Sequence, residues 1–445
     1  MKKHHLLKFI RILMHLVPLF AVLPATMAVA ETERRPNVIV IVGDDVGYGD
    51  LSVHGCKDIP TPNIDSIATN GIRATNGYVS GPICSPTRAA LLVGRYQNRF
   101  GHEFNPGGKV PENFGLSVGE TTLADHFLKA GYSTALIGKW HLGWKPAFHP
   151  MERGFQEFFG FLGGARPYLP GKLSVPFSRG HERIEEKEYL TDAFKRETLD
   201  FISHHKEHPF LLYLAFNAVH TPTLATESYL NRFPNITDNR RRTYAAMLSA
   251  MDDAVGAILA KLRADGLEEN TLVFFISDNG GAKDNGSTNG VLHGTKTTTW
   301  EGGIRVPWLV QWKGHLPAGR TYDHPVIQLD IAPTSLAAAG IPIPAKAKFD
   351  GVNLLPFLRG ENEAPPHAAL FWRFGKQTAV RKGDWSLVEA DDSEGKRLFN
   401  LREDIGQKID LSASKPDIIR ELERDWEEWN KGNIPPTWAP SEPEL

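Results

Sequence analysis

Five short stretches of the sequence are apolar at nearly every position, and this feature constrains the fold most strongly. Strands of a parallel sheet are covered by helices on both faces, so they are apolar throughout instead of alternating apolar and polar side chains. We predict buried parallel strands at Asn37 to Val42, Thr134 to Ile137, Phe210 to Phe216, Leu272 to Ile276 and Val306 to Gln311.

Helical patterns separate these stretches. A short helix is predicted from Pro62, with Thr61 as its cap, to a stop at Gly71. The clearest pattern places apolar side chains along one face of a longer amphipathic helix, at Tyr244, Met247, Leu248, Met251, Val255, Ile258 and Leu262. Strands that alternate with helices predict an α/β fold, with a mostly parallel central sheet flanked by helices.

The pattern changes after about Gly360, where GENEAPPH forms a polar connection that contains proline. A chain of 445 residues also exceeds the size at which one hydrophobic core usually stops growing. We therefore predict a large α/β domain over residues 31–360 and a smaller α+β domain over residues 361–445. The smaller domain is expected to hold an antiparallel sheet of short strands and a closing helix after Pro416.

Residues 1–30 have the layout of a secretory signal peptide. Lys2 and Lys3 precede an apolar run from Ile12 to Val22, and small residues lead to a predicted cleavage site after Ala30. The apolar run is short for a membrane span, and a retained N-terminal anchor is the alternative. No other segment is apolar enough to cross a bilayer, so we expect no stable membrane insertion and a periplasmic or secreted protein.

The charge of the chain argues against nucleic-acid binding. The formal net charge is −2, and loss of the predicted signal peptide moves it to −6, because that segment carries four Lys and Arg residues and no acid. Proteins that bind nucleic acid need a basic patch or stripe, and the sequence has none.

Acidic side chains follow two of the predicted strands. Asp44 and Asp45 come directly after the first strand, and Asp278 and Asn279 follow the strand at 272–276. Ligands of doubly wound folds bind at the carboxyl ends of the strands. Oxygen donors without sulfur or imidazole indicate a hard divalent cation, with Ca²⁺ favoured over Mg²⁺. The alternative is that these residues cap turns, as Asp often does.

Basic side chains occupy similar positions. Lys139, His141 and His220 follow two other strands, and Lys296 lies on a predicted loop. Cations gathered near a bound metal would suit an anionic substrate and its transition state. The alternative is that each histidine is structural and that Lys296 is a solvated loop charge.

The chain has two cysteines, Cys56 and Cys84, and a disulfide between them is one possibility in an exported protein. Pro86 and the apolar residues after it place Cys84 at the N-terminus of a helix. Backbone N–H groups and the helix dipole would stabilise a thiolate or an oxyanion there, and Arg88 could reach the same spot. This position favours a reactive group over a structural bridge.

The segment CSPTRAALLVGR at 84–95 resembles the sulfatase pattern C-x-P-S/T-R-x-x-L-x-x-G-R, in which the cysteine is converted to formylglycine, an aldehyde. The chain thus resembles the formylglycine-dependent type I sulfatases of the alkaline-phosphatase-like superfamily, over essentially the whole mature sequence. Further segments that resemble family counterparts are NVIVIVGDDVGYGD at 37–50, TPNIDSIATNGI at 61–72, GKWHLG at 138–143, AVHTP at 218–222, FFISDNGG at 274–281 and KTTTWEGGIRVP at 296–307.

The resemblance implies one bound Ca²⁺ and a maturation enzyme that generates the formylglycine. The implied metal ligands are Asp44, Asp45, Asp278, Asn279 and the oxidised side chain of Cys84.

The resemblance also implies roles for the basic residues. Arg88 would hold the hydrated aldehyde, and His141 would hydrogen-bond one of its hydroxyls. Lys139 and Lys296 would bind sulfate oxygens, and His220 would protonate the leaving group. One hydroxyl of the diol would attack sulfur as the alcohol leaves, and the second would collapse to the aldehyde and expel sulfate.

The sequence departs from the family pattern at two places. His293 stands where many relatives carry arginine, and it is expected either to face the substrate or to replace a structural residue. Arg166 stands where relatives often place Ala-His. We take His102, Arg166, His181 and His293 as candidates for binding the substrate.

These observations predict a sulfatase that hydrolyses sulfate monoesters, with a sulfated carbohydrate as the expected substrate. One alternative is a phosphodiesterase or phosphonate monoester hydrolase of the same superfamily. Another is a relative that binds polysaccharide without modification of Cys84 and without catalysis. The intact Pro86 and Arg88 of the maturation motif argue against this last alternative.

Overall fold

The computed structural model describes residues 34–105, 113–171, 175–344 and 347–439. The predicted signal peptide, residues 1–30, lies outside the described residues. Within the described ranges, no helix combines the length and the hydropathy that a bilayer crossing needs.

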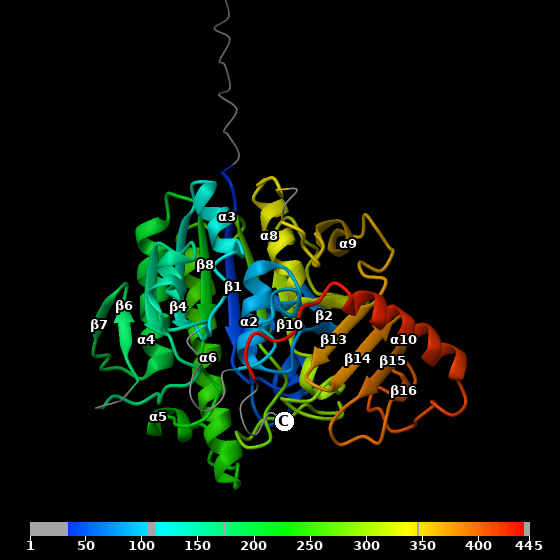
Figure 1. Cartoon of the computed structure of the whole chain (residues 1–445). Helices are drawn as coiled ribbons and strands as arrows, with labels where there is room; N and C mark the ends of the chain where they lie inside the picture. The colour runs from blue at the N-terminus through cyan, green and yellow to red at the C-terminus, as the bar shows by residue number, and fades with distance from the viewer. Residues whose placement is uncertain (1–33, 106–112, 172–174, 345–346, 440–445) are drawn as a thin grey trace, which may run out of the picture. The chain divides into compact units, whose positions relative to one another are not determined.

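A ten-stranded mixed sheet forms the centre of the protein, in the order β11-β2-β10-β9-β1-β8-β4-β5-β6-β7 (Figure 1). Five neighbouring strands at its centre are parallel: β9 (Thr271–Ser277), β1 (Asn37–Gly43), β8 (Phe210–Ala215), β4 (Ser133–Lys139) and β5 (Glu157–Phe161). The outer strands are β2 (Ile72–Ala74), β10 (Trp308–Gln311), β11 (Arg320–Tyr322), β6 (Phe177–Arg179) and β7 (Glu182–Ile184). The predicted α/β class is confirmed.

The predicted direction of the strand at 306–311 is wrong. Strand β10 runs antiparallel to β9, with Trp308 opposite Ile276. A parallel neighbour requires a crossover that carries the chain back to the starting edge of the sheet, usually as a helix. The connection from β9 to β10 contains only the short helix α7 (Glu301–Ile304), so the chain enters β10 from the carboxyl edge of β9.

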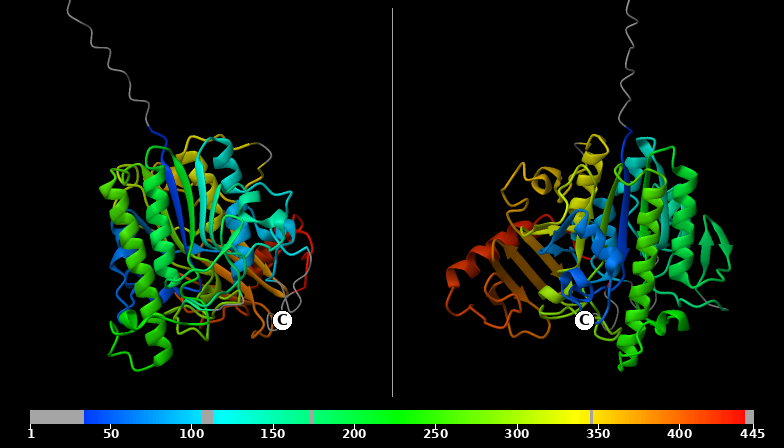
Figure 2. Two further views of the ribbon diagram at one scale, coloured as in Figure 1. Left: turned by 90° about the vertical axis from the view of Figure 1, so that its left-hand side faces the viewer. Right: turned by 180° about the vertical axis from the view of Figure 1, so that it is seen from behind.

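Helices cover both faces of the main sheet (Figure 2). Alternate residues of β1 point to opposite faces of the sheet, and both faces are apolar. Ile39 and Ile41 belong to one apolar core, and Val38, Val40 and Val42 belong to the other. The first core includes α1 (Pro62–Thr69), α4 (Leu190–His205) and α6 (Asn239–Ala264). The second includes α2 (Cys84–Val93), α3 (Leu123–Lys129), α8 (Ile331–Ala338) and α9 (Leu355–Arg359).

A separate antiparallel sheet follows in the sequence, as predicted. Its strands are β13 (Leu370–Phe374), β14 (Gln377–Lys382), β15 (Trp385–Glu389) and β16 (Arg397–Asn400). Helix α10 (Pro416–Asn430) packs on this sheet through Leu422. The shorter elements are α5 (Glu227–Leu230), β3 (Gly77–Tyr78) and β12 (Val326–Ile327). The domain boundary at residue 360 stays a prediction.

Candidate active site

The two predicted acidic pairs meet at the carboxyl edge of the main sheet. Strands β1 and β9 are parallel neighbours in register, so the residues that follow them lie side by side. The backbone N–H of Asp45 donates to Asp278 Oδ1 at 3.2 Å, and Asn279 Nδ2 donates to Asp45 Oδ1 at 2.7 Å. Asp44, Asp45, Asp278 and Asn279 are all buried.

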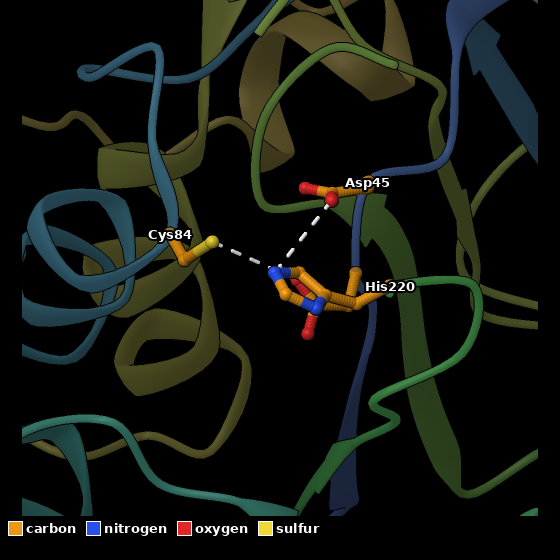
Figure 3. A group of neighbouring side chains, drawn as sticks. Asp45, Cys84 and His220 are labelled. Atoms are coloured by element: carbon orange, nitrogen blue, oxygen red, sulfur yellow. Dashed lines mark hydrogen bonds and ion pairs between the residues drawn. The ribbon is translucent and has the colours of Figure 1, made fainter. Parts of the chain in front are cut away.

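Cys84 is the first residue of helix α2, as the sequence predicted, and its side chain points into this acidic cluster. Cys84 Sγ lies 3.7 Å from Asp44 Oδ1. One potential ligand atom from each of Asp44, Asp45, Cys84 and His220 lies within 4.8 Å of the others. Figure 3 shows Asp45, Cys84 and His220 of this group. Asp278 adjoins this group. The structure therefore brings together all the predicted metal ligands and adds His220.

The structure excludes the disulfide alternative, in agreement with the position of Cys84, but it opposes a thiolate at that residue. Both cysteines are free, because Cys84 contacts Asp44 whereas Cys56 Sγ donates to Asp58 Oδ1 at 3.1 Å, so no disulfide joins them. Burial also raises the pKa of the Cys84 thiol to about 12, although Lys139 and Lys296 lower it. At neutral pH the unmodified side chain is thus a protonated thiol, since burial outweighs the stabilisation of a thiolate by the helix N-terminus.

Three buried or half-buried cations neutralise the acidic cluster. Arg88 donates to Asp278 Oδ2 from both Nε and Nη2, at 2.9 and 2.7 Å. Lys139 Nζ donates to Asp44 Oδ2 at 2.6 Å, and Lys296 Nζ lies 2.8 Å from Asp45 Oδ1. Although burial opposes ionisation, Lys139, His220 and Arg88 hold the pKa of Asp44 well below its ordinary value. Each carboxylate therefore has a cationic partner, and Asp44 has a second one in Arg88, whose Nη2 lies 3.7 Å from Asp44 Oδ1.

The two predicted catalytic histidines differ in what they face. His141 is buried, and burial together with Lys139 and Arg88 lowers its pKa far enough to keep it neutral. Its ring lies so close to Gly164 that a Cβ there would meet Nε2 at 2.5 Å. His220 Nδ1 donates to the Thr221 carbonyl, so Nε2 carries the lone pair, 3.8 Å from Asp45 Oδ2. Burial lowers the pKa of His220, although Asp44 and Asp45 raise it.

The cluster fits a hard divalent cation. Asn279 Oδ1 is buried without a hydrogen-bond partner, because the amide nitrogen of the same side chain makes the bond to Asp45. Burial and the charge of Asp44 raise the pKa of Asp278 to about 6, although Arg88 lowers it. Crowded carboxylates with a free amide oxygen supply the donor set that Ca²⁺ prefers.

The four predicted substrate-binding residues lie apart from one another. His293 is exposed, with its ring against Trp300, and His181 stacks on His149. Arg166 Nη1 donates to the Val175 carbonyl. His102 is only 1% exposed, so its substrate role stays a prediction with no surface to support it.

Ser85, which was not among the predicted site residues, contacts two of them. Its hydroxyl donates to the His141 carbonyl at 2.7 Å and lies 2.6 Å from His102 Nε2. Because the hydroxyl proton goes to the carbonyl, His102 Nε2–H must be the donor to Ser85 Oγ. The pair thereby holds His141 at φ 58°, a left-handed conformation that residues other than glycine rarely adopt. The pattern C-x-P-S/T-R leaves the position of Ser85 unspecified, so the sequence carried no signal for this contact.

Left-handed backbone recurs in this cluster. Among the described residues, Asp45 at φ 66° and Thr297 at φ 73°, next to Lys296, share this conformation with His141. Such conformations are costly and persist where surrounding structure imposes them, which is common at functional sites.

Comparisons with known proteins agree with this geometry. A family model described as Sulfatase matches residues 36–341, and one described as N-sulphoglucosamine sulphohydrolase, C-terminal, matches residues 293–407. The chain is 37% identical over 361 residues to N-acetylgalactosamine-6-sulfatase of Homo sapiens. This alignment covers 75% of this chain and 67% of that protein.

Solved structures extend the likeness to nearly the whole chain. The crystal structure of Ps i-CgsB matches with a TM-score of 0.88 and 36% identity, covering 92% of this chain and 96% of that one. The same protein has been solved with k-i-k-neocarrahexaose. The PsFucS1 sulfatase from Pseudoalteromonas sp. matches with a TM-score of 0.77 and 26% identity, covering 90% of each chain. A phosphonate monoester hydrolase of Agrobacterium radiobacter, at 20% identity and a TM-score of 0.63, shares the fold.

Proposed function

The chain belongs to the sulfatase family and is a sulfuric ester hydrolase, and from this premise we propose that it removes O-sulfate groups from a sulfated carbohydrate, using a formylglycine made from Cys84 and a bound Ca²⁺. The observation that carries this proposal is the buried Cys84 side chain, which starts helix α2 among carboxylates and cations.

The chemistry of the site supports conversion of Cys84. A thiol with a pKa near 12 is a poor nucleophile at neutral pH, because the reactive form is the thiolate. A hydrated formylglycine would supply two hydroxyls on one carbon, so that one can attack sulfur and the other can release sulfate. A serine could not do this, since its sulfate ester would have no second hydroxyl.

Asp44, Asp45, Asp278 and Asn279 would hold the cation, with the oxidised Cys84 side chain as a further ligand. A bound Ca²⁺ would supply positive charge where negative charge develops on the oxygens in the transition state. Binding by Asp44 and Asp45 would also release the ammonium groups of Lys139 and Lys296 from their carboxylate partners. The buried, unpartnered Asn279 Oδ1 supports this donor set.

The cations have separate roles in the proposal. Lys139 and Lys296 bind sulfate oxygens, and Arg88 and His141 orient the hydroxyls of the modified Cys84. Arg88 suits this task because its Nη1 is buried without a partner while its other nitrogens hold Asp278. His220 donates a proton to the leaving alcohol from Nε2, which therefore has to be protonated first.

Relatives support the choice of a carbohydrate. One is an N-acetylgalactosamine-6-sulfatase, and the structure most similar in fold among those described above binds a neocarrahexaose. A phosphate or phosphonate ester substrate has weaker support, because the likeness to the phosphonate monoester hydrolase is one of fold. The proposal also keeps the signal peptide at 1–30, a periplasmic or secreted location, a maturation enzyme as partner and the domain boundary at 360.

The test combines sulfate release with mass spectrometry. Natively produced protein should carry an aldehyde at residue 84 and release sulfate from defined sulfated oligosaccharides, with much slower turnover of a matched aryl phosphate. Cys84→Ala should abolish turnover and keep the fold. An active preparation that carries only an unmodified thiol at residue 84 would contradict the proposal.

A further inference from the structure

A cavity of about 750 Å³ lies between the main sheet and the antiparallel sheet. Asn76 and Arg305 line it from segments next to β2 and β10, and Leu370 and Arg381 line it from β13 and β14. None of its lining residues belongs to the candidate active site. Its volume is in the range of pockets that hold small-molecule ligands.

Arg381 is a buried cation without a counter-ion in this cavity. The residue is 5% exposed, and its Nε and Nη1 have no hydrogen-bond partner among the residues that the structure describes. Within the described part of the chain, its guanidinium forms no ion pair. The neighbouring acid, Glu301, is already engaged, because Glu301 Oε2 accepts from Tyr78 Oη at 2.9 Å and from Arg305 Nη1 at 3.3 Å. A buried charge without a partner is strongly unfavourable, so this position favours an anionic ligand.

The other charged groups of the cavity divide by depth. Arg305 is buried like Arg381, whereas the lining acids Asp323 and Asp384 are exposed. Asp323 Oδ1 also accepts from Thr75 Oγ1 at 2.7 Å. Of the other basic side chains in the lining, Arg402 and His324 are exposed, and His367 hydrogen-bonds Asp330. The buried part of the cavity is therefore cationic.

We propose that this cavity is a second anion site, in which Arg381 binds a sulfate group. The guanidinium of Arg381 can donate charge-assisted hydrogen bonds to an oxyanion, and neither its Nε nor its Nη1 is engaged by another described residue. The choice of sulfate rests on the proposed function, which supplies sulfate groups as substrate and product. The presence of an anion site rests on Arg381 alone.

The site is separate from the catalytic centre. Phe374 lies at the turn of the β13–β14 hairpin, where it pairs with Gln377 and belongs to an apolar cluster with Cys84. Arg381 lies on β14, four residues beyond Gln377 and away from that turn. Four residues of extended strand span about 13 Å. A sulfate held by Arg381 is thus either another group of a multiply sulfated glycan or free inorganic sulfate.

The direct test is a selenate soak of crystals of the wild-type mature protein. Selenate replaces sulfate, and selenium is located by its anomalous signal. We expect a peak in contact with the Arg381 guanidinium. Its absence at a concentration that saturates sulfate binding in solution would overturn the inference. A peak at Arg381 in a protein that releases no sulfate would contradict the proposed function and leave the anion site standing.

Solution measurements separate the two sources of sulfate. Calorimetric titration with sodium sulfate, at constant ionic strength, should lose one binding event in Arg381→Gln, or weaken it by about 10-fold or more. Arg420→Gln, an exposed arginine on α10, is the matched control and should bind like the wild type. Unchanged sulfate binding in Arg381→Gln would refute the inference. If this variant does not fold, the selenate soak of the wild-type protein tests the anion site.

The kinetic comparison uses an aryl sulfate and a multiply sulfated oligosaccharide. Arg381→Gln should leave kcat and KM for the aryl sulfate unchanged. A higher KM for the oligosaccharide alone identifies a second sulfate of the glycan as the ligand. An unchanged KM, together with lost binding of inorganic sulfate, identifies the free anion.

Discussion

Replacement of Ser85 by alanine tests whether the position of His141 is set by a neighbour that never touches the substrate. The Ser85 hydroxyl links two buried polar groups, the His141 carbonyl at 2.7 Å and His102 Nε2 at 2.6 Å. Alanine keeps the helix and removes both hydrogen bonds. We expect the backbone of His141 to leave its left-handed conformation and its imidazole to shift away from residue 84.

The magnitude follows from the two groups left unpaired. His102 and His141 are both buried, so each lost bond leaves an unsatisfied group that costs about 1–3 kcal/mol, and Ser85→Ala should destabilise by about 2–6 kcal/mol. A displacement of about 1 Å at a catalytic group can lower the rate by about 100-fold. We therefore expect kcat to fall about 10- to 100-fold and KM to change little.

Thr87→Ala is the matched control. Thr87 lies on the same turn of α2 and is equally buried, and its hydroxyl donates to the Gly81 carbonyl at 2.8 Å, away from His141. This variant should lose about 1–3 kcal/mol of stability and keep its kcat. The assay is steady-state sulfate release, corrected for aldehyde content measured by mass spectrometry. Equal losses of kcat in the two variants, or full activity of Ser85→Ala, would refute the positioning role.

Three further predictions concern proton transfer, the cation and pH. His220→Ala should slow substrates with poor leaving groups by about 100-fold and activated aryl sulfates much less, since general acid catalysis supplies about that factor; equal losses would exclude a proton-donor role. Dialysis against a chelator should abolish sulfate release and lower the Tm, with recovery on adding Ca²⁺, and indifference to the chelator would exclude the cation site. Burial lowers the pKa of His367, but the carboxylate of Asp330 raises it by more, so the net pKa lies above its ordinary value. The imidazolium proton of His367 is therefore held more tightly in the folded protein than in the unfolded chain. The stabilisation is complete below pH of about 6.5 and is lost as pH rises through the raised pKa, so the Tm difference between wild type and His367→Gln should shrink from pH 6 to 9; a constant difference would contradict this.

Local patterns predicted much of the main sheet. Continuous apolar runs located β1, β4, β8 and β9, because a strand that is covered on both faces is apolar at nearly every position. The direction of β10 escaped this reasoning, since its composition is that of any buried strand. Direction depends on the connection, and the segment between β9 and β10 lacks a helix long enough for a crossover.

The surroundings of two buried polar residues could not be predicted from residue type alone. His102 and Arg381 are both polar residues with no partner evident in the sequence. The structure buries His102 behind Ser85 and leaves Arg381 unpaired in a cavity. Burial of a polar group depends on which distant segments pack around it, and no local period records that.

By itself, the sequence determined that acidic and basic side chains follow buried strands and that Cys84 starts a helix, because strand ends and helix caps depend on neighbouring residues. Only the tertiary structure decided which groups pair. Asp45 and Lys296 are 251 positions apart, and Arg88 and Asp278 are 190 positions apart. Their contact, the raised pKa of Cys84 and its separation from Cys56 all depend on packing between distant segments, which is a property of the folded chain as a whole.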